Sequence, residues 1–502
     1  MKTLKELADR IEGAVLTGNP ATEILGIEHD SRKAAKGTLF VAIPGVHVDG
    51  AKFIPQAVAA GAVAVLTEAG HAAEVPEGVA LLTVPALNAA LDDIVPFFHD
   101  YPARSMRVIG ITGTNGKTTT SYITRAILRH AGYKVGLIGT IQIMIEDEVL
   151  PIHNTTPDVV ELQNTLALMR EKGMDYVVME VSSHALAENR VAGIEFDTAV
   201  FTNLTQDHLD YHKTLENYKL AKAKLFDLVS APGVKKGKTA VINIDDAAST
   251  TMLEHAHCRH LTYGIQSSVA SLRATDINVR ADGAQFTLRH HAFGQMLLSL
   301  HITGIFNVYN VMSAVGAALA EGVAAGDIQA ALEAFAAVPG RFELVKEGQD
   351  FAVIVDYAHT PDGVENVLKT ARKIAKRRII AVFGCGGDRD RTKRPIMGRL
   401  AASLADVVIA TSDNPRSENP DAILDEVEAG VKETIGAKHY ERITDRHTAI
   451  FRAIALAEKD DIVVILGKGH ENYQILADKT IHFDDREQAR AAIAAKRTGE
   501  NA

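Results

Sequence analysis

Short runs of apolar residues alternate along the chain with longer segments in which apolar residues recur every three or four positions. The runs at residues 106–112, 176–181, 198–203 and 239–244 predict buried strands, and the segments between them predict helices. Strands that alternate with helices are typical of a mostly parallel sheet covered by helices on both faces. The pattern therefore predicts an α/β fold.

Breaks in this pattern divide the chain into three expected domains. Residues 1–104 carry short β runs and one Ala-rich helix near residues 55–60, separated by Gly, Pro and Asp turns, which predicts a small α/β domain. Residues 105–337 hold the strands described above. This central domain ends in Ala-rich helices expected at residues 311–325 and 328–337.

The last segment, residues 338–502, opens with a chain break at Pro339-Gly340 and returns to strands that alternate with helices. This arrangement predicts a second open sheet of the Rossmann type, in which ligands bind beyond the carboxyl ends of the strands. The strands are expected at residues 352–356, 379–385, 407–411 and 462–466.

The composition excludes several classes of function. Lys and Arg number 53 and Asp and Glu 63, so a formal charge of −10 opposes general binding to nucleic acid or anionic lipid. Cys258 and Cys385 lie far apart and build neither a disulfide framework nor a cysteine zinc site. No apolar run reaches the roughly 18 residues of a membrane helix, and no apolar leader follows Met1. We expect a monomeric, cytoplasmic protein without nucleic-acid or membrane partners.

A glycine-rich loop joins the strand at 106–112 to a helix expected at 118–130. Its backbone N–H groups, helix N-terminus, lysine and hydroxyl are the groups that bind a triphosphate with Mg²⁺. Lys117 would hold the β and γ phosphates, and Thr118 would supply a hydroxyl to the metal. The alternative is a glycine-rich turn with a surface lysine, because the glycines depart from the strict spacing of such loops. The loop residues are Gly113, Thr114, Asn115, Gly116, Lys117, Thr118 and Thr119.

Acidic and histidine residues follow two further strands of the central sheet. Glu180 ends one buried strand at the edge where parallel sheets bind ligands, and is a candidate Mg²⁺ ligand. Asp207 and His208 follow the next strand and form a candidate second metal site beside the terminal phosphate. Helix caps and turns are the alternative for these residues. A hydrolase is disfavoured, because the adjacent Ser183 and His184 seldom reach each other and no G-x-S-x-G turn is present.

Together with further motifs along nearly the whole chain, these residues resemble the Mur ligases of peptidoglycan synthesis. The resemblance implies an amide ligase that uses ATP and Mg²⁺: ATP phosphorylates a substrate carboxylate, and an incoming amine attacks the acyl phosphate. Such a polyanionic transition state needs Mg²⁺ and cationic side chains more than a protein nucleophile. The further motifs are Asp30-Ser31-Arg32, Asn154-Thr155-Thr156-Pro157-Asp158, Gly340-Arg341, Asp356-Tyr357-Ala358-His359, Gly386-Gly387-Asp388-Arg389, Asp413-Asn414-Pro415-Arg416 and Gly467-Lys468-Gly469-His470-Glu471.

The resemblance also implies roles for single residues around the nucleotide. Lys222 matches a lysine that the family carries as a carbamate, an anion that can orient Mg²⁺ instead of repelling it. The sequence alone does not distinguish this lysine from Lys219 or Lys224, nor one metal ion from two. If the nucleotide contacts are as implied, the last domain closes onto the central one. The implied catalytic residues are Lys117, Glu180, His208 and Lys222; the implied metal ligands are Thr118, Glu180, His208 and Lys222; the implied further nucleotide contacts are Asn307, Arg341, Asp356 and His359.

The same resemblance implies that UDP-N-acetylmuramoyl-L-alanyl-D-glutamate is the acceptor substrate, bound by a UDP-binding first domain and by the central domain. The alternative for the threonines in this set is a cap on the helix that follows Pro157. At Glu188 the family often carries an amide instead. The implied contacts are Ser31 and the turn Val46-His47-Val48 for the uridine part, and Asn154, Thr155, Thr156, Ser182, Glu188 and Arg190 for the phosphate, sugar or peptide part.

Arg416 indicates which amino acid is added. By resemblance, arginine at this position is typical of the family members that add meso-diaminopimelate. This amino acid differs from lysine by a carboxylate on its distal carbon. A guanidinium binds such a carboxylate bidentately, while a lysine ammonium would gain nothing from it. The alternative is an Asn-Pro turn with a surface arginine. The other implied contacts of the amino acid are Arg389, Asp413, Asn414, Pro415, Gly467 and Glu471, the last suited to the distal ammonium.

Two other functions stay open at this point. One is a different ligase of the superfamily, such as folylpolyglutamate synthetase or another Mur step; the Asp30-Ser31-Arg32 stretch argues against a folate ligase, which lacks a UDP-sugar module. The other is a switch that binds ATP without ligating anything. A whole last domain bearing Arg416 and Glu471 argues against it.

Overall fold

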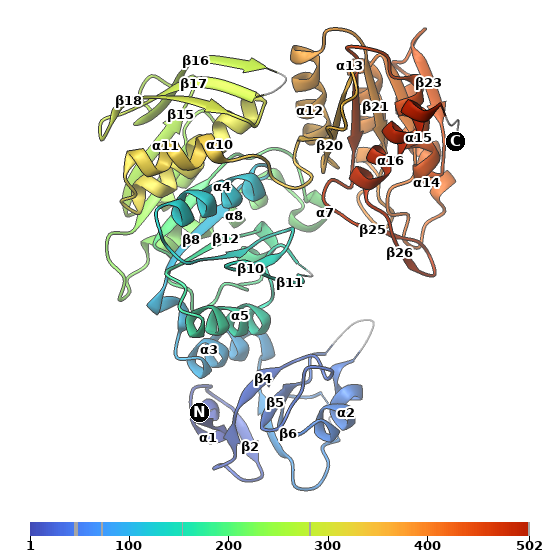
Figure 1. Cartoon of the computed structure of the whole chain (residues 1–502). Coiled ribbons are helices and arrows are strands. Elements are labelled where there is room, and N and C mark those ends of the chain that lie inside the picture. The colour runs from blue at the N-terminus through green and yellow to red at the C-terminus, as the bar shows by residue number, and fades with distance from the viewer. Residues whose placement is uncertain (45–48, 72–73, 153, 281–282, 500–502) are drawn as a thin grey trace.

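The computed structural model describes residues 1–44, 49–71, 74–152, 154–280 and 283–499. It confirms the α/β class and contains three main sheets, which lie in an N-terminal, a central and a C-terminal body. The N-terminal body lies at one end of the molecule, and the C-terminal body lies beside the central one (Figure 1). Within these described ranges, no helix combines the length and the apolar character needed to cross a bilayer.

The N-terminal body is a five-stranded sheet in the order β2-β7-β6-β5-β4, in which β2 pairs antiparallel and the other pairs are parallel. Leu39, Leu66 and Leu82 form its core, which extends to Val159 and Val160 of the central body. The elements are β1 (Lys2–Thr3), α1 (Leu4–Ala8), β2 (Val15–Thr17), β3 (Glu23–Ile24), β4 (Gly26–Glu28), β5 (Thr38–Val41), η1 (Gly50–Phe53), α2 (Ile54–Ala59), β6 (Ala62–Glu68), β7 (Ala80–Val84), α3 (Leu87–Phe98) and η2 (Pro102–Ser105).

The central body is built on an eleven-stranded sheet in the order β11-β10-β9-β12-β8-β13-β14-β15-β16-β17-β18. The strands from β9 to β16 pair in parallel, as expected, and their buried residues pack against helices on both faces. The elements are β8 (Arg107–Thr112), α4 (Lys117–His130), β9 (Val135–Ile138), β10 (Ile143–Ile145), β11 (Glu148–Leu150), α5 (Val159–Glu171), β12 (Tyr176–Glu180), α6 (Ser183–Ala187), β13 (Thr198–Phe201), α7 (Leu209–His212), α8 (Leu215–Ser230), β14 (Thr239–Asn243), α9 (Ser249–His255), β15 (Arg259–Gly264), β16 (Leu272–Arg280), β17 (Gly283–His290), β18 (Gly294–Leu300), α10 (Ile305–Ala320) and α11 (Ala325–Ala334).

Two parts of this body differ from the sequence-based expectation. Strands β17 and β18 extend the sheet in antiparallel pairing from β16. Buried and exposed side chains largely alternate along β16, β17 and β18 instead of forming apolar runs. The helices α10 and α11 lie earlier in the chain than residues 311–325 and 328–337. Gly304 at φ 100° precedes α10, and Gly322 at φ 80° follows it, a left-handed conformation that ends helices.

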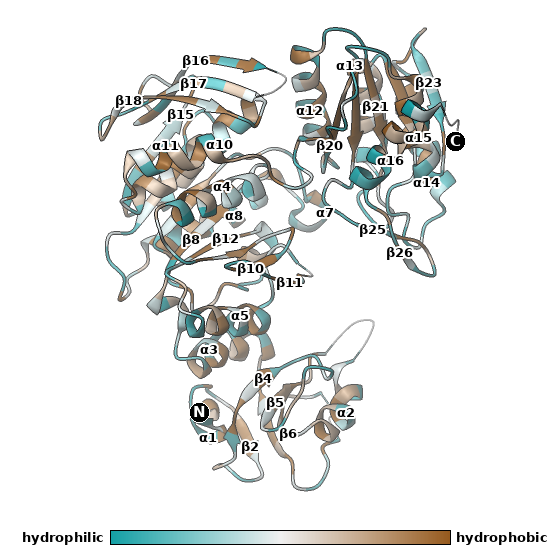
Figure 2. Ribbon diagram, in the orientation of Figure 1, coloured by the Kyte–Doolittle hydropathy of each residue, from teal (hydrophilic) through white to brown (hydrophobic). Residues whose placement is uncertain are grey.

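The C-terminal body is a six-stranded sheet in the order β19-β20-β24-β21-β22-β23, parallel except for β19. Its middle strands are apolar on both faces and lie between more polar helices (Figure 2). Gly340 packs against the loop after β24, where a Cβ would lie 2.0 Å from the backbone nitrogen of His470. The elements are β19 (Glu343–Leu344), β20 (Ala352–Asp356), α12 (Pro361–Ile374), β21 (Ile379–Phe383), α13 (Lys393–Leu404), β22 (Val407–Ala410), α14 (Pro420–Lys432), β23 (His439–Arg442), α15 (Arg446–Leu456), β24 (Ile462–Leu466), β25 (Tyr473–Ile475), β26 (Thr480–His482) and α16 (Asp485–Thr498).

Candidate functional site

The glycine-rich loop between β8 and α4 has a backbone path that requires its glycines. Gly113 has φ 147°, and a Cβ there would lie 1.9 Å from the hydroxyl of Thr202. Gly116 has φ 86°, and a Cβ there would lie 2.2 Å from the side-chain oxygen of Asn310. Because neither position accepts a side chain, the loop brings bare backbone to the N-terminus of α4, where anions bind.

Two lysines converge on this loop. Lys117 donates from its Nζ to the carbonyl oxygens of Gly113 and Thr114, at 2.9 Å each. Lys222 is fully buried on α8 and donates to the same Gly113 carbonyl at 2.8 Å. Burial lowers the pKa of Lys222 well below its ordinary value, and the positive charge of Lys117 lowers it further. The two amino groups at one carbonyl therefore disfavour each other's positive charge, and burial favours the neutral form of Lys222.

The structure also distinguishes the three lysines of α8. Lys219 pairs with Glu216 at 2.8 Å, and Lys224 reaches only the carbonyl of Leu186, at 3.4 Å. Of these three, Lys222 is the one that contacts the phosphate loop. Burial and position therefore separate residues that the helical pattern leaves equivalent.

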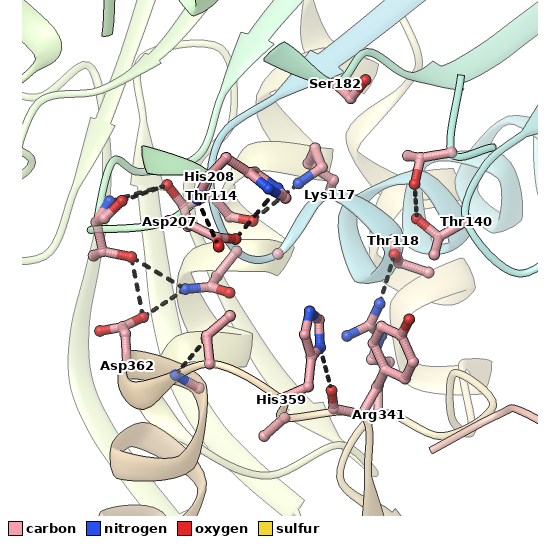
Figure 3. Close-up of a pocket in the computed structure, with 18 of the residues that line it drawn as sticks. Thr114, Lys117, Thr118, Thr140, Ser182, Asp207, His208, Arg341, His359 and Asp362 are labelled. Atoms are coloured by element: carbon pink, nitrogen blue, oxygen red, sulfur yellow. Dashed lines mark hydrogen bonds and ion pairs between the residues drawn. The ribbon is translucent and has the colours of Figure 1, made fainter. Parts of the chain in front are cut away.

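Hard oxygen donors gather beside the loop. The carboxylate of Glu180 is fully buried at the end of β12 and accepts hydrogen bonds from the Thr118 hydroxyl at 3.1 Å and from the Thr140 hydroxyl at 2.9 Å. Arg341 of the C-terminal body donates to the Thr118 hydroxyl at 3.1 Å (Figure 3). Hydroxyl and carboxylate oxygens are the ligands that Mg²⁺ prefers, so this donor set fits that ion. Among the described residues, no three His, Cys, Asp or Glu side chains are placed to hold a metal together.

His208 lies just past β13, at φ 53°, with its Nε2 3.4 Å from a carboxylate oxygen of Asp207. Its ring contacts that of His184 edge to face, with centroids 4.7 Å apart. Partial burial lowers the pKa of His208, and nearby positive charges, those of Lys117 and Lys222 among them, lower it further, although Asp207 acts in the opposite direction. The imidazole is therefore neutral at neutral pH, and it lines the cavity.

The C-terminal body contacts the phosphate loop directly. Asp362, in the first turn of α12, accepts hydrogen bonds from the side-chain amide of Asn115 and, at 3.3 Å, from the hydroxyl of Thr205. Arg341 reaches Thr118 on the same loop. Figure 3 shows these C-terminal residues facing the loop across the cavity. The structure is thus in an arrangement in which the last body closes onto the central one.

The amino-acid end of the site lies beyond the carboxyl ends of the C-terminal strands. Arg416 has φ 53°, donates from Nη1 to the carbonyl of Gly387 at 2.8 Å, and lines the cavity. Glu471 also lines the cavity, and one of its oxygens accepts hydrogen bonds from Asn414 at 2.8 Å and from the buried Lys468 at 2.9 Å. A guanidinium and a carboxylate therefore share one wall.

A single cavity of about 1150 Å³ joins these parts. It runs from the phosphate loop to Arg416 and Glu471, so residues that are far apart in the sequence share one space. Of the predicted site residues, the structure brings the following together in its lining: Thr114, Asn115, Gly116, Lys117, Thr118, Thr119, Asn154, Thr155, Glu180, Ser182, Arg190, His208, Arg341, Asp356, His359, Arg389, Asp413, Asn414, Arg416, Gly467 and Glu471.

Other predicted residues do not line this cavity. Gly113 belongs to the loop itself, Lys222 contacts the Gly113 carbonyl from α8, and Pro415 precedes Arg416. Asn307 is buried with its side-chain amide bonded to the Thr303 carbonyl at 2.8 Å, while Asn310, one turn later on α10, lines the cavity.

The remaining predicted substrate contacts have local partners. The hydroxyl of Thr156 donates to the backbone of Glu180 at 2.9 Å, and Glu188 pairs with Arg190 at 2.7 Å. Ser31 lies in the N-terminal body, where its hydroxyl donates to Gln56 at 2.9 Å. The predicted uridine turn, Val46-His47-Val48, lies outside the described residues.

Sequence reasoning missed several residues of the site. Lys393, Asn310, Thr140 and Asp362 line the cavity, and Lys468 supports Glu471 from behind. Two of them stand in motifs that were already recognised: Asp362 follows His359-Thr360-Pro361, and Lys468 lies three residues before Glu471. The other three carry no local signal, because only the packing of α10, α13 and the loop after β9 brings them to the site.

Comparisons with known proteins agree with this geometry. The family model described as the Mur ligase middle domain matches residues 111–318, the Mur ligase glutamate ligase domain matches 340–469, and the Mur ligase family catalytic domain matches 23–103.

Individual relatives match over nearly the full length. A protein of Syntrophomonas wolfei named UDP-N-acetylmuramoyl-L-alanyl-D-glutamate--2,6-diaminopimelate ligase is 45% identical over 493 residues, covering 98% of this chain and 99% of the relative. A protein of Bacillus cereus with the same name is 48% identical and covers 95% and 96%. A solved structure that also carries this name superposes with a TM-score of 0.67 at 33% identity and covers 99% of both chains.

Proposed function

Because the chain belongs to the Mur ligase family, we propose that it is the ATP-dependent ligase that joins meso-2,6-diaminopimelate to UDP-N-acetylmuramoyl-L-alanyl-D-glutamate in peptidoglycan precursor synthesis. One observation carries the choice of amino acid. Arg416 and Glu471 line the same cavity as the phosphate loop. A guanidinium that matches the distal carboxylate of diaminopimelate and a carboxylate that matches its distal ammonium therefore lie in the cavity that would bind the nucleotide.

The chemistry proceeds in two steps. The γ-carboxylate of the D-glutamate attacks the terminal phosphorus of ATP, which forms an acyl phosphate and releases ADP. The amine of diaminopimelate then attacks the acyl carbon, and the tetrahedral intermediate expels phosphate and loses a proton to give the amide. Lys117 and Arg341 are placed to neutralise the charge that moves between the phosphates, the main demand of phosphoryl transfer.

A magnesium ion would be held by the Thr118 hydroxyl and the Glu180 carboxylate, with the neutral ring of His208 as a further ligand. When bound with ATP, the ion supplies positive charge to the phosphates.

Lys222 would act as a carbamate. Its burial favours the neutral amine, which can add to carbon dioxide to give an N-carboxylate and a proton. The product carries a negative charge, which the positive charge of Lys117 attracts. Labelled bicarbonate followed by carbon-13 NMR tests this: the parent is expected to show one carbamate signal that Lys222→Met lacks.

The three bodies would then divide the work. Residues 1–104 hold the UDP part through Ser31, residues 105–337 bind ATP and the acceptor peptide, and residues 338–502 bind the amino acid. Asn307 would support the nucleotide through Asn310, which bonds its side-chain oxygen at 3.0 Å. We further propose that the enzyme works as a monomer in the cytoplasm, where its nucleotide substrates are made.

An amino-acid-dependent phosphate-release assay tests the proposal. Purified protein with ATP, Mg²⁺ and UDP-N-acetylmuramoyl-L-alanyl-D-glutamate is expected to release phosphate when meso-diaminopimelate is present and to remain near background with lysine. Equal turnover with lysine would contradict the choice of amino acid. ATP binding without an amide product from any acceptor would instead support a nucleotide-binding switch.

A further inference from the structure

Behind the amino-acid end of the cavity lies a buried lysine with no role in the mechanism above. Lys468 has no exposed surface and is not among the residues that line the cavity. Its Nζ lies 2.9 Å from Oε2 of Glu471 and 3.1 Å from Oδ1 of Asn414. Burial of an ammonium destabilises the folded protein unless fixed partners compensate its charge, and here Glu471 and Asn414 are those partners.

The three side chains form a closed triangle of hydrogen bonds. Asn414 donates from Nδ2 to the same Glu471 Oε2 at 2.8 Å, and its Oδ1 also accepts from the backbone N–H of Ile475 at 3.0 Å. The amide of Asn414 is therefore oriented by a cation and a backbone donor on one side and by a carboxylate on the other. Lys468 and Asn414 both bond Oε2, which fixes the orientation of the Glu471 carboxylate in the cavity wall.

The surrounding chain keeps this triangle rigid. Gly467, directly before the lysine, has φ 116°, and a Cβ there would lie 2.4 Å from a carboxylate oxygen of Asp413. Gly469, directly after it, has φ 52°, and a Cβ there would lie 2.6 Å from the Cβ of Tyr357. Because both flanking positions are confined, Lys468 has little freedom to move away from Glu471.

The balance of charges at the amino-acid end of the cavity determines which ligand groups bind there. Without Lys468, Glu471 and Asp413 would place two carboxylates near the distal carboxylate of the substrate, opposed by Arg416. The buried ammonium neutralises one of them. The wall can then accept an ammonium at Glu471 and a carboxylate at Arg416 together, which is the pattern of a zwitterion and not of a simple cation.

We propose that Lys468 is a positioning residue that sets specificity: it fixes Glu471 and balances its charge, so that the enzyme selects a distal zwitterion over a distal amine. This inference rests on the proposed function and deepens it. Lys468 acts through Glu471 and does not itself touch the substrate.

Kinetics of the full-length enzyme with Lys468→Met test this. The substitution keeps an unbranched apolar side chain as far as Cε and removes the ammonium group. The KM for meso-diaminopimelate is expected to rise about 10- to 100-fold, the range for losing a charge-assisted hydrogen bond. The KM for ATP is expected to stay within twofold, and the preference for meso-diaminopimelate over lysine to fall. Because KM does not depend on the fraction of folded molecules, partial instability does not imitate this result.

Two further variants distinguish an effect through Glu471 from a general effect of losing a buried ion pair. In the Glu471→Gln background, Lys468→Met is expected to add less than threefold to KM, because its partner charge is already gone. Lys235→Met breaks another buried ion pair, that with Asp197 at 2.6 Å, and is expected to leave the KM for meso-diaminopimelate unchanged. An unchanged KM in Lys468→Met, or equal effects of this substitution in both backgrounds, would overturn the inference. Absence of diaminopimelate turnover in the parent would instead refute the proposed function.

Discussion

Replacing Arg416 with alanine gives the most direct test of amino-acid selection. Arg416 has φ 53°, and alanine also carries a Cβ, so the backbone conformation costs about the same before and after the change. What is lost is the guanidinium that faces the cavity. A charge-assisted hydrogen bond contributes roughly 1.5–3 kcal/mol, and because Arg416 is only half-buried we take about 2–3 kcal/mol for the pair of bonds to a carboxylate.

This loss corresponds to a fall of about 30- to 150-fold in kcat/KM for meso-diaminopimelate. The measurement is phosphate release at varied amino-acid concentration, with ATP and the acceptor saturating. Turnover with lysine is expected to stay at its parent level, because lysine has no distal carboxylate. Arg399→Ala serves as the control: this arginine lies on α13 and pairs with Glu433 at the surface, away from the cavity. A change of less than threefold in Arg416→Ala would refute the assignment.

Three further predictions concern the nucleotide loop and its surroundings. Asp362→Ala removes the acceptor that holds Asn115 across the domain contact, so the KM for ATP should rise about tenfold, while an unchanged value would show that the contact has no role in binding. Gly113→Ala forces a Cβ to within 1.9 Å of the Thr202 hydroxyl and should lower the free energy of unfolding by about 1–3 kcal/mol in a urea titration, an effect that an unshifted midpoint would exclude. His212 is buried, and its burial lowers its pKa to about 4, whereas the unfolded chain binds a proton below about pH 6.5. Its contribution to stability is thus full above that pH and is lost as the pH falls toward 4, so the Tm of His212→Asn should depend less on pH between about 5 and 7 than that of the parent. Parallel Tm profiles would contradict this reasoning.

Much of the fold could be read from the sequence, because buried parallel strands are apolar along their whole length. The strands β20 (Ala352–Asp356) and β24 (Ile462–Leu466) have the expected bounds, and the loop before α4 has the expected strand-loop-helix context. The antiparallel strands β16 to β18 could not be read in this way. Their exposed face is polar, so they lack the apolar run that marks a buried strand.

The candidate site shows the same division. The residues of the phosphate loop are contiguous, so their chemistry follows from the motif alone. Lys222 is different, because a helix with lysines at 219, 222 and 224 offers no local reason to choose one of them. Only the packing of α8 against the sheet buries Lys222 at Gly113 and leaves the others with local partners.

By itself, the sequence determined the kind of chemistry: an anion-binding loop, oxygen and nitrogen ligands at strand ends, and a guanidinium in the last third of the chain. Tertiary structure decided which of these groups share a space, and it added the contacts of Lys468, Asn310 and Asp362, which no local pattern predicts. The physical reason is that spacing along a chain sets neighbours only within one element. Burial, charge balance and contact between distant residues arise when separate elements pack together.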